Sequence, residues 1–87
     1  PLADVELSEV EKEVLGQLID KIRSAESGEG LQIEIFKLIR SKGLKPKGFF
    51  PKLYKILLGT DKGPKAGPLI LALGKERVIE RVKRYLS

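Results

Sequence analysis

The sequence predicts an all-α fold, a compact bundle of four to five short helices. Apolar residues recur at the 3.6-residue helical period in several stretches, and glycine and proline fall between those stretches. With 87 residues, 41% of them hydrophobic, the chain can bury one small core. We therefore expect residues 1–87 to form a single helical domain.

The first predicted helix starts at Ser8. Its hydroxyl can accept from the backbone three residues on, where Glu11 supplies the carboxylate of a capping box. The helix should fade within residues 24–28. Its apolar stripe contains Val10, Val14, Leu15, Leu18, Ile19 and Ile22.

A second helix is expected over residues 31–41, after Gly30. The alternation of apolar and polar residues over 31–35 is also compatible with a strand. A helix is favoured over a strand because the apolar pattern continues through residues 36–40 at helical spacing. Gly43 then provides a left-handed cap.

After a connector at 44–48, a third helix is expected over residues 49–58. Pro51 would lie in its first turn, where a missing N–H costs least. Phe50, Leu53, Tyr54 and Leu57 share one face, so this spacing assigns Phe50 and Tyr54 to the core.

Two Gly-Pro pairs make residues 60–68 a sharply turned loop. A short helix over 68–73 is apolar nearly all round and is expected to be buried, closed by Gly74. A last helix, 75–86, directs its apolar side chains inward and its charged ones outward. The inward set is Val78, Ile79, Val82 and Leu86.

Charge is distributed unevenly. Residues 1–30 hold three basic and eight acidic residues, net −5, whereas residues 31–87 hold fourteen basic and four acidic residues, net +10. Residues 37–65 contain nine Lys or Arg and one acid, Asp61. Such asymmetry indicates a polyanionic partner, although a solvated lysine-rich surface would give the same pattern.

Several chemistries are excluded by composition. Without His or Cys there is no Ser-His or Cys-His nucleophile and no zinc site built from those ligands. The longest apolar stretch, 69–73, is too short to span a membrane, and the glycine spacing matches no phosphate-loop motif. The absence of Asn and Met beside abundant Lys and Glu suggests a thermophile. The start at Pro1, without Met, suggests part of a longer protein.

The strongest candidate site is the stretch 45–55, where lysines interleave with aromatic residues at a helix start. Lysines neutralise phosphates and aromatic rings stack on unpaired bases, which is the chemistry of RNA recognition. Phe49 lies on the strip next to the predicted core, so we expect its ring to be available for stacking. The loop 61–67 adds two lysines that could contact phosphate, although it is equally compatible with a plain helix–helix corner. The predicted RNA-binding residues are Lys45, Lys47, Phe49, Lys52, Lys62 and Lys65.

Residues 44–86 also carry an ordered pattern. Phe50, Tyr54 and the run Leu57-Leu58-Gly59 are followed by a Gly-Pro…Gly loop and by an apolar run into Gly74-Lys75-Glu76. This order resembles the C-terminal region of class I lysyl-tRNA synthetases, the mainly archaeal lysine enzymes related to glutamyl-tRNA synthetases.

The resemblance implies a helical, C-terminal, anticodon-end domain that binds tRNA, specifically the tRNA-Lys anticodon stem-loop. Catalysis with ATP, and any zinc site, would belong to the catalytic domain of a cytoplasmic parent, because the nucleotide-binding signatures of class I synthetases are absent here. No cofactor is expected in this chain. Two alternatives remain: a structural or protein-interaction helical domain, and a nucleic-acid binder without sequence preference.

Overall fold

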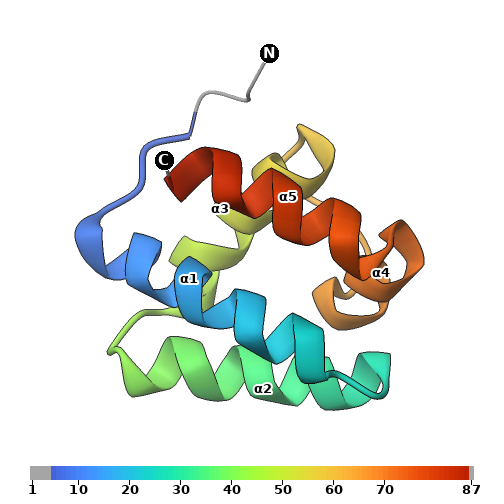
Figure 1. Ribbon diagram of the computed structural model, residues 1–87. Coiled ribbons are helices and arrows are strands. Elements are labelled where there is room, and N and C mark those ends of the chain that lie inside the picture. Colours follow the sequence, from blue (N-terminus) through green and yellow to red (C-terminus); the bar gives the residue numbers. More distant parts are fainter. Residues whose placement is uncertain (1–4, 87) are drawn as a thin grey trace.

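The structure, a computed structural model, describes residues 5–86, and over that range the chain is all-α (Figure 1). The predicted fold class is confirmed, and the strand alternative for residues 31–35 is wrong because that segment is helical. The helices are α1 (Glu9–Ser24), α2 (Gly28–Ser41), α3 (Pro46–Leu58), α4 (Ala66–Leu73) and α5 (Lys75–Leu86).

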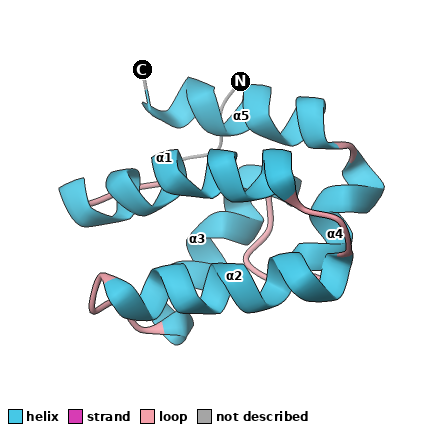
Figure 2. Cartoon of the chain, turned by 60° about the horizontal axis from the view of Figure 1, so that its bottom comes forward, coloured by secondary structure: helices cyan, strands magenta, loops and turns pink. Residues whose placement is uncertain are grey.

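The helices pack in a globule with principal extents of 30 × 29 × 23 Å. α1 lies between α2 and α5 and contacts both (Figures 1 and 2). α3 packs against α2 and α5, and α4 closes one end by contacting the same two helices. None of the described helices is both long enough and apolar enough to cross a membrane.

The start of α1 matches the predicted capping box. The Glu11 N–H donates to Ser8 Oγ at 3.1 Å, and the Ser8 N–H donates to Glu11 Oε1 at 2.8 Å. At the other end, Lys75 Nζ donates to the carbonyls of Arg23 and Ala25 at 3.2 and 2.6 Å. This lysine therefore satisfies carbonyls that the end of α1 leaves without helical partners.

Three helices begin earlier than predicted. α2 starts at Gly28 because Ser27 caps it, accepting from the Gly30 N–H at 3.0 Å. α3 starts at Pro46, so Pro51 lies inside the helix and not in its first turn. α4 starts at Ala66 instead of residue 68.

The buried face of α3 differs from the predicted one. Both faces share Leu53 and Leu57, but the structure buries Phe49 and Ile56 with them, and Phe50 and Tyr54 lie at the edge of the core. Both sets have helical spacing, so periodicity alone does not distinguish them. The buried set is wholly apolar and leaves the tyrosine hydroxyl near solvent.

α4 is only partly buried, with its covered side formed by Ala66, Gly67 and Ile70. Its first turn lies directly on α2. A Cβ on Gly67 would come within 2.2 Å of the Gly28 carbonyl oxygen and 2.7 Å of the Gln32 nitrogen. The Gly67 N–H donates to Gln32 Oε1 at 2.6 Å. Glycine at position 67 thus permits backbone-to-backbone packing of the two helices.

Candidate nucleic-acid interface

Three partly exposed rings form an aromatic row, Phe36, Phe50 and Tyr54, which runs from α2 across α3. The ring centroids of Phe36 and Phe50 are 5.2 Å apart, and those of Phe50 and Tyr54 are 6.3 Å apart. These spacings are typical of interacting aromatic pairs. Each of the three rings is partly exposed, so each offers ring surface on which an unpaired base could stack.

Positive charge accompanies the aromatic row. The Arg40 guanidinium lies 5.6 Å from the Phe36 ring centroid, one helical turn along α2. Lys47 precedes Phe50 by three residues in α3, so helical geometry places the two on the same side. A cation therefore lies at the α2 end of the row, and another lies on α3 beside its central ring.

The loop after α3 is fastened to the end of the row. The Tyr54 hydroxyl donates to the Pro64 carbonyl. Gly63 lies so close that a Cβ there would come within 2.8 Å of Leu58 Cδ1 and 3.0 Å of Tyr54 Cδ1. Burial raises the pKa of Tyr54 above its ordinary value of 10.0, so the phenol stays a neutral donor. These contacts hold Lys62 and Lys65 on the loop beside the row.

Four of the predicted phosphate-binding lysines are exposed: Lys45, Lys47, Lys62 and Lys65. Within the part of the chain that the structure describes, none of them forms an ion pair. Lys45 and Lys47 lie at the start of α3, and the other two lie in the loop that Tyr54 anchors. Phosphate could replace solvent at these ammonium groups without breaking an internal bond.

Lys52 is placed differently. Its Nζ donates to Glu11 Oε1 at 2.8 Å and closes the α1 capping box against α3. Burial alone would raise the pKa of Glu11, but hydrogen bonds from Lys52 and Ser8 outweigh it and hold the pKa below the ordinary value of 4.5. Lys52 is thus engaged in a structural ion pair.

The prediction that the Phe49 ring is available for stacking is wrong. Its side chain is 1% exposed and lies in the core with Leu53 and Ile56. Sequence reasoning also missed Phe36 and Arg40. The four-residue spacing of that aromatic and guanidinium on one helix was the available signal.

Metal or acid–base chemistry finds no support in residues 5–86. No group of three or more acidic side chains there could hold a metal ion. Glu11 is the one buried charged side chain in that range, and its carboxylate is held by the bonds that cap α1. The arrangement is suited to binding an anion that carries flat rings.

Comparisons with known proteins agree with this chemistry. The family model described as "Anticodon binding domain" matches residues 3–86. A lysine–tRNA ligase of Cenarchaeum symbiosum (strain A) is 40% identical over 84 residues, covering 97% of this chain. The lysine–tRNA ligase of Methanopyrus kandleri is 38% identical over 95% of the chain, and that of Borrelia garinii subsp. bavariensis is 31% identical over 92%.

The chain spans 16% of the length of each of these three relatives. No solved structure matches it significantly. The resemblance to lysyl-tRNA synthetases drawn from residues 44–86 is confirmed and extends over nearly the whole sequence. The chain belongs to the anticodon binding domain family.

Proposed function

We propose that this chain binds the anticodon stem-loop of tRNA-Lys, as the anticodon-end domain of a class I lysine–tRNA ligase. The observation that carries the proposal is the aromatic row with Arg40 at its α2 end and, nearby at the start of α3 and in the following loop, four exposed lysines that form no ion pair within residues 5–86, in a chain of this family. The names of the relatives support the choice of tRNA.

Binding would combine two contributions. Lys45, Lys47, Lys62 and Lys65 would neutralise backbone phosphates and supply most of the salt-dependent affinity. The rings of the aromatic row would stack on bases that the anticodon loop leaves unpaired, and hydrogen bonds to those bases would discriminate among anticodons.

The remaining activity would belong to a longer, cytoplasmic parent protein. Activation of lysine with ATP, its transfer to tRNA, and any zinc site would lie in the catalytic domain that this chain accompanies. This proposal is supported by the coverage of the relatives: the chain matches only 16% of each lysine–tRNA ligase, so most of such a protein lies outside the matched region.

The test is binding of the 87-residue chain to a tRNA-Lys anticodon stem-loop, with a changed-anticodon loop as control, across a salt series. We expect tighter binding to the lysine anticodon at every salt concentration, because base contacts depend little on salt. Equal, steeply salt-dependent binding of both loops, and of a DNA hairpin, would contradict anticodon recognition and indicate a non-specific binder. Absence of RNA binding at low salt, with binding of an acidic peptide, would indicate a protein-interaction domain.

A further inference from the structure

A second surface, separate from the aromatic row, combines apolar and cationic groups. It is a recess of about 100 Å³ where α3, α4 and α5 meet. Its lining consists of Leu57, Leu73, Arg77, Val78 and Arg81, and we refer to it as the α5 recess. The sequence pattern predicts only that the charged side chains of residues 75–86, these two arginines among them, face outward.

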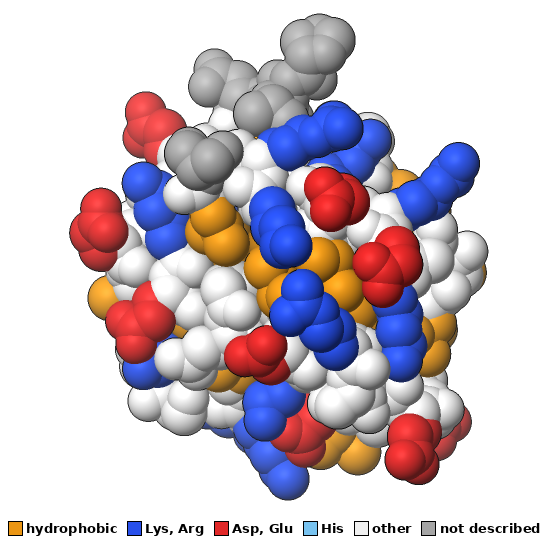
Figure 3. All heavy atoms as spheres, in the orientation of Figure 1, with side chains coloured by type: hydrophobic (Ala, Val, Ile, Leu, Met, Phe, Trp, Pro, Cys, Tyr) orange, Lys and Arg blue, Asp and Glu red, His pale blue; other side chains and the backbone are white. Residues whose placement is uncertain are grey.

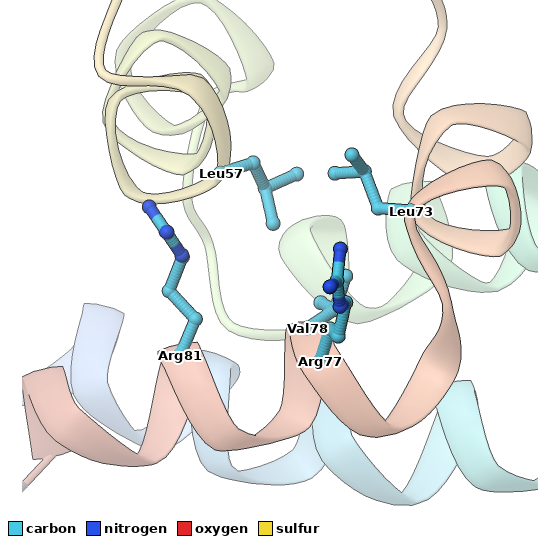
Figure 4. Close-up of a pocket in the computed structure, with 5 residues that line it drawn as sticks. All are labelled: Leu57, Leu73, Arg77, Val78 and Arg81. Atoms are coloured by element: carbon cyan, nitrogen blue, oxygen red, sulfur yellow. The ribbon is translucent and has the colours of Figure 1, made fainter.

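The two arginines extend from α5 toward α3 and α4, and in Figure 4 they lie on either side of Leu57. Figure 4 shows Arg77 between Leu57 of α3 and Leu73 of α4 in that view, with Arg81 directed toward α3. Arg81 Nη1 donates to the Ile56 carbonyl at 3.3 Å, which fixes its position. Arg77 is exposed.

Neither guanidinium forms an ion pair with a carboxylate of residues 5–86. Glu76 and Glu80 lie on the neighbouring outer surface of α5 with the arginines. On the face that carries α5, basic and acidic side chains surround a small exposed apolar area (Figure 3). The recess therefore pairs two available cations with apolar atoms, whereas the helix surface around it is of mixed charge.

Charge and shape together indicate the occupant. Arginine side chains one turn apart can both reach one phosphate, and a guanidinium plane also stacks on a base. An apolar cavity of about 150 Å³ holds a benzene molecule, so a recess open to solvent and of this size accommodates the edge of one planar ring. A nucleotide joins a flat ring to a phosphate, so it matches both the apolar lining and the arginines of the α5 recess.

We propose that the α5 recess binds one unpaired nucleotide of the bound RNA, with its phosphate on Arg77 and Arg81 and its base against Leu57 and Leu73. This inference rests on the proposed function, since the RNA is the same molecule. It adds a contact on α5, beyond the aromatic row of α2 and α3.

The first test compares Arg77→Ala with Lys83→Ala, which removes the same charge from another side of α5. Affinity for the anticodon stem-loop is measured for both across a salt series. Arg77→Ala should weaken binding at least tenfold, the loss expected for one charge-assisted hydrogen bond, and flatten the salt slope by about 0.7. Lys83→Ala should change affinity less than twofold. Equal effects of the two variants would overturn the proposal.

The second test fills the recess without altering charge. Leu73 is partly exposed, so Leu73→Phe should place its ring over the floor and leave the fold intact, checked by thermal melting. Binding should weaken severalfold while the salt slope stays that of the wild type. Unchanged affinity would show that no base enters the recess and would contradict the proposal.

The outcomes separate the two proposals. If the wild-type chain binds the stem-loop and Lys47→Glu weakens that binding, but Arg77→Ala behaves like Lys83→Ala, only the α5 recess is refuted. If the wild type binds no RNA, both proposals fail. An Arg77 dependence seen with a glutamate-rich peptide and not with RNA would assign the recess to protein docking and overturn the nucleotide assignment.

Discussion

Phe36 and Phe49 illustrate how two rings of the same type take different roles in this small fold. Phe49 is fully buried between apolar neighbours, whereas Phe36 is partly exposed and contacts Phe50 at the protein surface. Stability should therefore depend mainly on Phe49, and RNA stacking on Phe36. The sequence does not show which of Phe49 and Phe50 is buried, because the two rings belong to alternative helical stripes that share Leu53. The burial of Phe49 could therefore not be predicted.

Replacing each ring by leucine tests this difference. Phe36→Leu should weaken stem-loop binding at least fivefold, because stacking on one base contributes about 1–3 kcal/mol, and should lower stability by roughly 1 kcal/mol through the lost Phe50 contact. Phe49→Leu should lower the free energy of unfolding by roughly 1–3 kcal/mol and leave affinity within twofold. Urea denaturation and RNA titration, at a temperature where both variants are folded, measure the two effects. The reverse pattern would exclude the aromatic row as the stacking surface.

Glu11 makes a pH-dependent contribution to stability. Its pKa in the folded chain lies below the ordinary value of 4.5, so between the two values the unfolded chain binds more protons. The stabilisation is therefore complete above pH 4.5 and is lost as pH falls through the folded pKa. Glu11→Gln should cost roughly 1 kcal/mol near neutral pH, and its difference from wild type should shrink below pH 4.5.

The matched control for that prediction is Glu13→Gln, two residues away on α1. Glu13 is exposed and pairs with Lys42, a surface contact worth about 0–1 kcal/mol. Glu13→Gln should change the free energy of unfolding by less than Glu11→Gln does. A pH-independent loss for Glu11→Gln would show that the carboxylate acts only through the shape of the capping box.

At the scale of elements, the packing of α4 on α2 is the most demanding contact. Gly67→Ala would place a methyl group 2.2 Å from the Gly28 carbonyl oxygen, and neither backbone can yield without separating the helices. We expect a loss of roughly 2–3 kcal/mol in the free energy of unfolding, measured by urea denaturation. Gly16→Ala, with no atom within 4 Å of the new Cβ, should instead gain about 0.5–1 kcal/mol. Similar effects of the two alanines would contradict the close approach of α2 and α4.

Helix type and order were readable from the sequence, but the starts of α2, α3 and α4 and the rotation of α3 were not. α1 was predicted well because Ser8 and Glu11 form a local signal that needs no tertiary partner. The start of α2 was missed because Gly28 and Gly30 disfavour helix in isolation, and there the Ser27 cap and the close contact of Gly28 with Pro68 of α4 outweigh their propensity. The α5 recess could not be predicted, since it exists only where three helices meet.

For the molecule as a whole, the fold pairs part of the acidic N-terminal third with the basic remainder. Glu11 binds Lys52, Glu13 binds Lys42, and Lys21 binds Glu34 across helix boundaries. Two of these pairs neutralise cations of residues 31–87, Lys42 and Lys52, whereas Lys21 neutralises an acid of that segment, Glu34. Within residues 5–86, four exposed lysines that pair with no carboxylate, Lys45, Lys47, Lys62 and Lys65, lie at the start of α3 and in the loop 59–65. The candidate interface that they form is smaller than the basic segment predicted from sequence.

That smaller interface sets the salt dependence of binding. If Lys45, Lys47, Lys62 and Lys65 each neutralise one phosphate of the anticodon arm, the plot of log affinity against log salt should have a slope of about −2.8 to −3.6. Lys47→Glu and Lys65→Glu should each weaken binding and flatten the slope by about one phosphate contact, 0.7–0.9, whereas Lys83→Glu should leave the slope nearly unchanged. A wild-type slope near −7, reduced equally by all three substitutions, would mean that RNA docks on the whole basic surface. A flat slope would mean that the lysines face solvent in the complex.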